Sequence, residues 1–206
     1  MINNFWRNLN ISTHGAIKED FKFPIPQKGH GVHWKYSPDQ VFTSEWYLNF
    51  KDKVKFDGDP TIILFYCEKN RTNDYAHIDI NEKHNPVTMV PSAFNWVVGG
   101  EGSHMVWYDQ YGFTEEALWY GPVSDTWKDT EPERHAPQAA IWKVNTLNEI
   151  ARLTVPTDYI TLVNTGIAHR IELGPEDRWC FSIRPPFKDS DNWESYINMA
   201  SGVITE

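Results

Sequence analysis

The sequence predicts a mainly β protein, an antiparallel sandwich or barrel with a few peripheral helices. Short runs of alternating apolar and polar residues recur along the chain, as in strands that bury one face. Glycine, proline, asparagine and aspartate separate these runs at the short intervals typical of an all-β domain. Apolar residues at helical spacing are confined to a few short segments.

The strands expected in the first half form a regular series. The run Thr-Ile-Ile-Leu-Phe-Tyr is rich in the β-branched and aromatic residues that strands favour. The next run begins at Tyr75 and carries polar residues on one face. A glycine-rich turn over 99–102 separates the last two runs. The predicted strands are 61–66, 75–80, 88–90, 94–98 and 104–108.

The second half repeats this rhythm after an interruption. Turn residues at 156–158, 165–166 and 174–177 separate predicted strands at 152–155, 159–164, 169–173 and 179–184. The segment 109–138 breaks the rhythm, because it is rich in Glu, Asp, Pro and aromatic residues and too long for a hairpin turn. A connection of this length is either a lid or binding loop that closes over a substrate, or a disordered insertion.

Three segments fit helices. Residues 44–54 place Trp46, Tyr47, Phe50 and Val54 at helical spacing. A short helix over 114–120 would take Thr114 as its cap. A C-terminal helix over about 190–200 would be capped by Ser190 or Asp191, with Trp193, Tyr196 and Ile197 facing inward.

Composition narrows the class of protein. The length of 206 residues fits a single domain over 1–206. A net charge of −9 makes the chain a poor candidate for binding nucleic acid, which needs a clustered basic surface. We expect no membrane span, since no stretch approaches about 18 apolar residues. With no signal peptide in the first ten residues and only Cys67 and Cys180, a reducing cytoplasm is the expected location.

Aromatic residues are abundant, at 15% of the chain. Large rings of this kind fill cores and their rims, and they also line ligand pockets. Both interpretations stay open from the sequence alone. The sequence carries no signal for an oligomeric state.

A possible metal-binding pair lies in the predicted strand 75–80. Side chains two residues apart on a strand point to the same face, so His77 and Asp79 can reach one ion. With a second histidine they would form the facial triad of non-haem iron(II) oxygenases, which leaves three coordination positions open. The His-x-Asp pattern alone is weak, because 8 histidines and 28 acidic residues predict roughly one such match by chance.

His169 is the candidate for the second histidine. It follows a strand and the turn at Thr165-Gly166, and it opens the next strand, at the mouth of a barrel. The alternative is a half-buried strand histidine bonded to a neighbour. Arg178 and Arg184 lie an even number of residues apart on one later strand, so both side chains can point inward. A buried arginine costs free energy unless it meets an anion. Either arginine can instead be a surface charge.

These residues resemble a known family, the Fe(II)/2-oxoglutarate-dependent oxygenases. The resemblance lies in His77-x-Asp79, in His169 about 90 residues later and in Arg178 nine residues after that. The phrases around 94–98 and 105–108 resemble the middle strands of that family. The phrase 162–170 resembles the strand pair that enters the distal histidine in aspartyl/asparaginyl hydroxylase-like and prolyl hydroxylase-like members from bacteria and phages. The resemblance covers the core, about residues 60–187.

The resemblance implies a double-stranded β-helix, which is a jelly-roll, cupin-like barrel. It also implies that His77, Asp79 and His169 bind Fe(II) and that Arg178 binds the distal carboxylate of 2-oxoglutarate. Cys180 stands where some members carry serine, so Arg184 remains the alternative carboxylate ligand. Asn95, Tyr108 and Trp107 are weaker pocket candidates, and a core role is favoured for Trp107.

The implied activity is hydroxylation of a small-molecule or peptidyl substrate with O2, which releases succinate and CO2. A cupin-type metalloenzyme that does not use 2-oxoglutarate is one alternative, because Gly166-x-x-His169 resembles a cupin motif. Cupin sites usually draw on His-x-His, however, and Asp79 departs from that pattern. A non-catalytic jelly-roll carbohydrate-binding module is the other alternative, and it gives no reason for Arg178 near His169.

Overall fold

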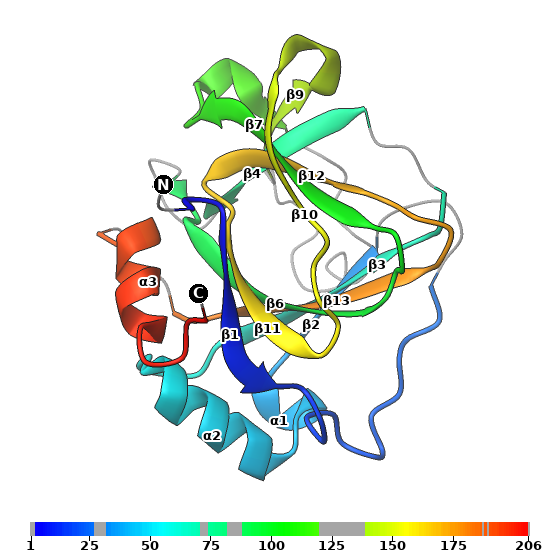
Figure 1. Ribbon diagram of the computed structural model, residues 1–206, viewed down its shortest axis with the longest axis vertical. Helices are drawn as coiled ribbons and strands as arrows, with labels where there is room; N and C mark the ends of the chain where they lie inside the picture. Colours follow the sequence, from blue (N-terminus) through cyan, green and yellow to red (C-terminus); the bar gives the residue numbers. More distant parts are fainter. Residues whose placement is uncertain are drawn as a thin grey trace, which may run out of the picture.

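The computed structural model describes residues 3–26, 32–70, 74–81, 88–119, 139–186, 188 and 190–205. Its strands form two antiparallel sheets that face each other, as Figure 1 shows. The prediction of a mainly β, antiparallel architecture with few helices is therefore confirmed.

The first sheet has six strands. Two of them come from the part of the chain that precedes the predicted core of about residues 60–187. Its order is β1 (Trp6–Ser12), β11 (Tyr159–Asn164), β6 (Ser92–Gly99), β13 (Arg178–Arg184), β3 (Thr61–Cys67) and β2 (Val32–Tyr36). Every neighbouring pair is antiparallel. Strands β1 and β2 were not predicted from the sequence, and they extend this sheet at its two edges.

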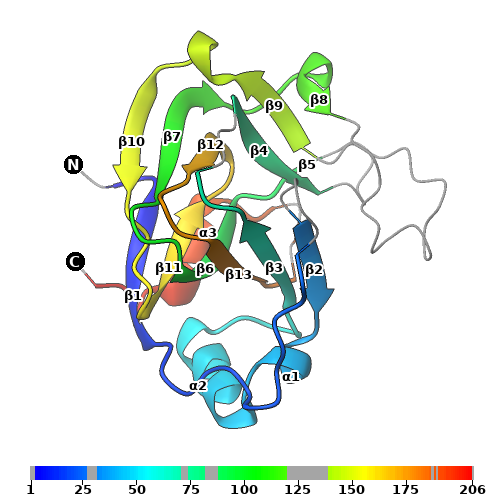
Figure 2. The ribbon, with the colours of Figure 1, turned by 90° about the vertical axis from the view of Figure 1, so that its right-hand side faces the viewer.

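The second sheet carries all three metal candidates. Its order is β10 (Glu149–Leu153), β7 (His104–Tyr111), β12 (Ile167–Glu172), β4 (Tyr75–Asn81), β9 (Ala139–Lys143) and β8 (Leu118–Trp119), and β5 (Thr88–Met89) pairs with β4. In Figure 2, β4 and β12 lie next to each other, and β13 belongs to the facing sheet. The two sheets thus bring distant parts of the chain to one enclosed space.

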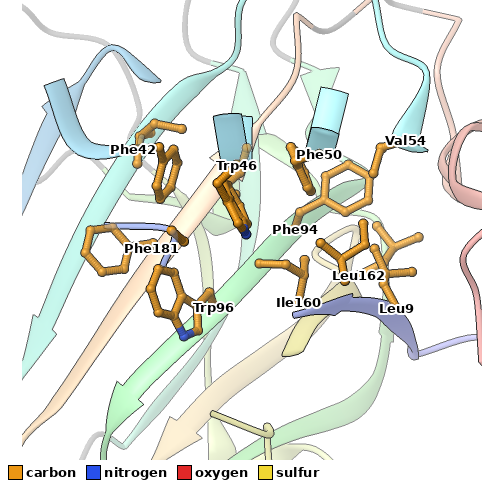
Figure 3. Packing of buried hydrophobic residues seen from close by; sticks show 14 of the residues in the cluster. Leu9, Phe42, Trp46, Phe50, Val54, Phe94, Trp96, Ile160, Leu162 and Phe181 are labelled. Atoms are coloured by element: carbon orange, nitrogen blue, oxygen red, sulfur yellow. The ribbon is translucent and has the colours of Figure 1, made fainter. Parts of the chain in front are cut away.

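Helices cover the outer face of the six-stranded sheet. They are α1 (Pro38–Val41), α2 (Ser44–Val54) and α3 (Trp193–Ala200). Trp46 and Phe50 of α2 pack with Phe94 and Phe181 of the sheet, as Figure 3 shows. The helix predicted over 44–54 is confirmed, because its period of about 3.6 residues places one apolar stripe on the sheet.

The C-terminal helix is also present, but it begins later than expected. Asn192, not Ser190 or Asp191, is the cap: its side chain accepts a hydrogen bond from the Ser195 amide at 3.0 Å. Tyr196 is buried against the sheet, as predicted.

A separate apolar cluster fills the space between the two sheets. It combines residues of β6, β7, β11, β12 and β13, namely Ala93, Val97, Met105, Trp107, Val163, Ile167 and Cys180, with Val155. A third cluster lies on the outer face of the second sheet, beneath residues 113–118 and 144–147. Alternation along each strand therefore decides whether a side chain faces the enclosed space or one of the outer layers.

Three sequence predictions need correction. The helix expected over 114–120 is a 3₁₀ turn, Glu115–Ala117, followed by strand β8, which pairs with β9. The insert expected from 109 begins later, because β7 continues to Tyr111; residues 120–138 lie outside the described residues. The strand expected at 152–155 is β10, shifted to Glu149–Leu153. No helix within the described ranges has the length and apolar character needed to cross a membrane.

Candidate metal centre

The three predicted metal ligands meet at the junction of β4 and β12. His77 and Asp79 lie two residues apart on β4 and share its inner face. His169 on β12 is the direct antiparallel partner of His77. One ligand atom from each residue lies within 4.8 Å of the other two. The sheet register, which joins residues about 90 positions apart, therefore assembles the site.

The side chains are oriented for shared coordination. The His77 Nε2 and Asp79 Oδ1 atoms are 3.4 Å apart, and the centroids of the two imidazole rings are 4.4 Å apart. The His169 Nδ1 atom lies 2.9 Å from the Ile167 carbonyl oxygen. That contact fits a proton on Nδ1 and leaves Nε2 for a metal, the arrangement common among metal-binding histidines.

The site is enclosed but open on one side. The side chains of His77 and Asp79 are 35% and 15% exposed, whereas His169 is only 4% exposed. The triad thus lies at the edge of the space between the sheets, where His77 and Asp79 keep contact with solvent.

Both Asp79 and His169 are held in the protonation states that bind metal. Burial alone would raise the pKa of Asp79, but the Arg184 guanidinium and the two imidazoles outweigh it and hold that pKa well below its usual range. Burial, assisted by the neighbouring His77, lowers the pKa of His169 to about 4. At neutral pH the site therefore offers an ionised carboxylate and an uncharged imidazole.

The donor set fits a divalent transition metal. Two imidazole nitrogens and one carboxylate oxygen form a three-ligand face, which leaves further positions open. The His-Asp-His triad is thus positioned to hold a metal ion.

Arg178 lies buried on the inner face of the facing sheet. It is 3% exposed, and within the described residues its Nη2 atom has no hydrogen-bond partner. The guanidinium also hydrogen-bonds with the Cys180 thiol, whose pKa burial raises. A Cβ added at Gly100 would lie 2.8 Å from the Arg178 Cβ, so glycine makes room for this side chain. A buried guanidinium with an unused donor fits an anionic ligand.

Asn95 is a second inward polar residue without a complete set of partners. It is the cross-strand neighbour of Thr161 and Ser182, and it is 8% exposed. Its buried Oδ1 atom has no hydrogen-bond partner in the part of the chain that the structure describes. Asn95 lies on the inner face of β6, and its role in a pocket stays a prediction.

Tyr108 does not belong to the site, and that prediction is wrong. Trp107 is the cross-strand partner of His169, so Tyr108, one residue on, faces the opposite side of β7. Tyr108 packs in the outer cluster, with the Arg170 guanidinium 5.8 Å from its ring centroid. Trp107 instead lines the enclosed space and donates from Nε1 to the Asn164 carbonyl oxygen at 2.8 Å.

Arg184 contacts the triad directly, which the sequence did not predict. Its Nη2 atom donates to Asp79 Oδ2 at 2.6 Å across the gap between the sheets, and its Nε atom donates to Ser182 Oγ at 3.2 Å. The alternation of β13 had placed Arg184 inward. Its partner is 105 residues away in the sequence, so only the tertiary fold identifies the pair.

A surface groove of about 820 Å³ lies elsewhere in the molecule. It is formed by residues 12–14, 96–102 and 154–158 with Glu176, and none of the triad residues lines it. Because it lacks the metal ligands, we place the candidate chemistry at the triad and not in this groove.

Comparisons with protein-family models, with curated proteins and with solved structures find no match to this chain.

Proposed function

We propose that this chain is a non-haem Fe(II)- and 2-oxoglutarate-dependent dioxygenase that hydroxylates a small-molecule or peptidyl substrate. One observation carries the proposal. A His-Asp-His triad and a buried arginine with an unused donor lie on the inner faces of the two opposing sheets. A metal would satisfy the triad, and an additional anion would satisfy the Arg178 Nη2 donor, which has no hydrogen-bond partner among the described residues.

The strand order supports a double-stranded β-helix, the barrel type that we propose. If β3, β4, β6, β7, β10, β11, β12 and β13 are numbered one to eight, the first sheet contains the order 1-8-3-6 and the second the order 2-7-4-5. Successive strands thus mostly alternate between the sheets, as expected when paired strands roll up into a jelly roll.

Iron(II) is the metal that this donor set favours. Two histidines and one carboxylate with open positions are characteristic of non-haem iron oxygenases. In this assignment His77, Asp79 and His169 hold the ion, and Arg184 fixes the Asp79 carboxylate through its Oδ2 atom. A structural zinc site is disfavoured, because such sites are closed by four protein ligands.

The cosubstrate assignment follows from Arg178. Its guanidinium would hold the distal carboxylate of 2-oxoglutarate, and Asn95 lies farther along the same inner face, opposite Ser182. Bound iron and 2-oxoglutarate supply the activation of O2 that places one oxygen atom on the substrate and releases succinate and CO2. The protein's own contribution is to position both groups and, through Trp107, Met105 and Val97, to keep water away from them.

Succinate formation tests this proposal. Protein prepared without oxygen is incubated with Fe(II), 2-oxoglutarate, O2 and a panel of amino acids, peptides and other metabolites. We expect succinate only when the metal, 2-oxoglutarate and O2 are all present, and none from His169→Ala. Tyr108→Phe is the matched control, because Tyr108 faces the outer layer, and it should retain the activity. Absence of succinate from the wild-type protein under all these conditions would contradict the proposal.

The alternatives predict different outcomes. A cupin-type metalloenzyme would bind metal at the triad, yet Arg178→Gln would not affect its turnover. A carbohydrate-binding module needs exposed aromatic platforms, which Tyr111 and Trp119 can supply, but it gives no role to the buried Arg178 or to the His-Asp-His triad. The arrangement of the described residues therefore favours the oxygenase.

A further inference from the structure

We propose that the prime substrate carries a negatively charged group, of the carboxylate class, and that Arg184 binds it at the opening of the site. This inference rests on the proposed function, because it concerns the substrate of the same metal centre. It is carried by the position of Arg184 and by the balance of charge on the inner faces of the two sheets.

Arg184 lies on the solvent side of the site. Its side chain is 20% exposed, compared with 3% for the whole of Arg178. One Nη atom contacts Asp79 Oδ2 at 2.6 Å, and the guanidinium carbon lies 6.0 Å from the Phe65 ring centroid. A planar cation beside an aromatic ring and open to solvent on one side is suited to a ligand that pairs a charge with an apolar body.

The described inner faces carry little negative charge. Alternation and register define the inward positions of five strands: 75, 77, 79 and 81 on β4; 167, 169 and 171 on β12; 93, 95, 97 and 99 on β6; 178, 180, 182 and 184 on β13; and 61, 63, 65 and 67 on β3. Among these described positions Asp79 is the only carboxylate, whereas Arg178 and Arg184 are both cations. The chain as a whole has a net charge of −9, so this inner surface contrasts with the rest of the molecule.

Metal and cosubstrate leave one positive charge unmatched. A divalent ion adds two positive charges to those of the two arginines, and Asp79 cancels one of the four. The two carboxylates of 2-oxoglutarate cancel two more. Over these groups a single positive charge remains in a partly desolvated site, where it is costly without an anion nearby. A bound metal would draw on the same Asp79 carboxylate that Arg184 contacts. Arg184 is therefore the cation that an additional anion would neutralise.

One carboxylate cannot serve both arginines. Arg178 and Arg184 stand six residues apart on β13, so their Cα atoms are separated by about 20 Å. Even with both side chains extended toward each other, the two guanidinium groups are too far apart to share one carboxylate. If the distal carboxylate of 2-oxoglutarate meets Arg178, the guanidinium of Arg184 is left for another ligand. The prime substrate is the remaining component that must approach the metal from the open side.

Paramagnetic relaxation tests this without knowledge of the substrate. The protein is loaded with Mn(II) and with N-oxalylglycine, an unreactive analogue of 2-oxoglutarate, and proton relaxation of the acetate and acetamide methyl groups is measured in the same sample. The two probes have nearly the same shape and differ in charge. We expect stronger relaxation for acetate, and about 10-fold weaker acetate binding in Arg184→Gln, as for the loss of one charge-assisted hydrogen bond. Arg184→Lys should restore part of the binding.

Controls separate this inference from the proposed function. Arg152→Gln removes an arginine that is paired with Glu149 and Glu172, and it should leave acetate relaxation unchanged. Equal relaxation of acetate and acetamide in wild-type protein that holds Mn(II) and N-oxalylglycine would overturn the inference alone. Loss of Mn(II) from Arg184→Gln would also overturn it, because Arg184 would then only position Asp79. Failure of wild-type protein to bind Mn(II) or N-oxalylglycine would instead reject the proposed function.

Discussion

Replacement of Arg178 by methionine should stabilise the metal-free protein while abolishing cosubstrate binding. The arginine is almost completely buried, and its Nη2 atom lacks a partner within the described residues. Methionine keeps the unbranched stem that packs against Gly100 and removes the buried charge. Groups retained for a ligand commonly destabilise the empty protein, and this substitution measures that effect.

The magnitude follows from the unsatisfied donor. A buried polar group without a partner costs about 1–3 kcal/mol, and the variant gives up the hydrogen bond to the Cys180 thiol, which offsets part of the gain. We therefore expect Arg178→Met to raise the free energy of unfolding by about 1–2 kcal/mol. For a chain of this size each kcal/mol shifts Tm by about 2–4 °C.

Urea unfolding of the metal-free protein in EDTA measures this change. The midpoint should rise with an unchanged m-value. Arg184→Met is the matched control on the same strand and face, and it should have the opposite sign. It leaves Asp79 without its cation and should cost about 1–3 kcal/mol, less than a fully buried pair because both side chains keep some contact with water. Addition of Mn(II) and N-oxalylglycine should then raise Tm for the wild type far more than for Arg178→Met.

A loss of more than about 1 kcal/mol in Arg178→Met would refute this reasoning. It would mean that Arg178 is a structural residue whose partners are already sufficient. The main support for a bound 2-oxoglutarate would then be gone.

Three other substitutions test separate parts of the account. Asp79→Asn should weaken Mn(II) binding, measured by calorimetry. The loss of affinity should exceed the about 10–100-fold that is typical when a metal-binding side chain loses a hydrogen-bond partner that does not itself bind the metal. Burial raises the pKa of Tyr196 to about 12, so its contribution to stability is intact below pH 10 and falls between pH 10 and 12, where only the unfolded chain ionises. Tyr196→Phe should therefore reduce the alkaline decline in the free energy of unfolding, obtained from urea titrations, by up to about 1.4 kcal/mol per pH unit. Gly174→Ala should destabilise the protein by about 1–3 kcal/mol in the same assay, because its Cβ would lie 2.2 Å from the Glu101 carbonyl oxygen.

The sequence predicted those parts of the site that depend on local periodicity. His77 and Asp79 share a face because strand side chains alternate, and the same rule turned Arg178 and Arg184 inward. It failed for Tyr108, because both faces of β7 are buried and adjacent aromatic residues leave the parity of the strand undefined. Where both faces are apolar, only the partner strand decides which side chain faces the metal.

Tertiary contacts decided the remaining features. Leu118 and Trp119 form a strand with β9 where a helix was expected, because pairing with a neighbour overrides weak local propensity. The contact between Arg184 and Asp79 joins positions that no short motif relates. The edge strands β1 and β2 were not predicted, although Gly31 and Ser37-Pro38 flank β2 in the sequence, and their pairing with β11 and β3 identifies them.

The most direct measurement is an anaerobic titration of Fe(II) and 2-oxoglutarate, followed by visible absorption. We expect a weak metal-to-ligand charge-transfer band that requires both Fe(II) and 2-oxoglutarate. The band should be absent in His169→Ala, and in Arg178→Gln it should need a higher concentration of 2-oxoglutarate. Iron that binds to the wild-type protein without producing this band would contradict the assignment of 2-oxoglutarate, and wild-type protein that binds no iron would contradict the metal centre itself.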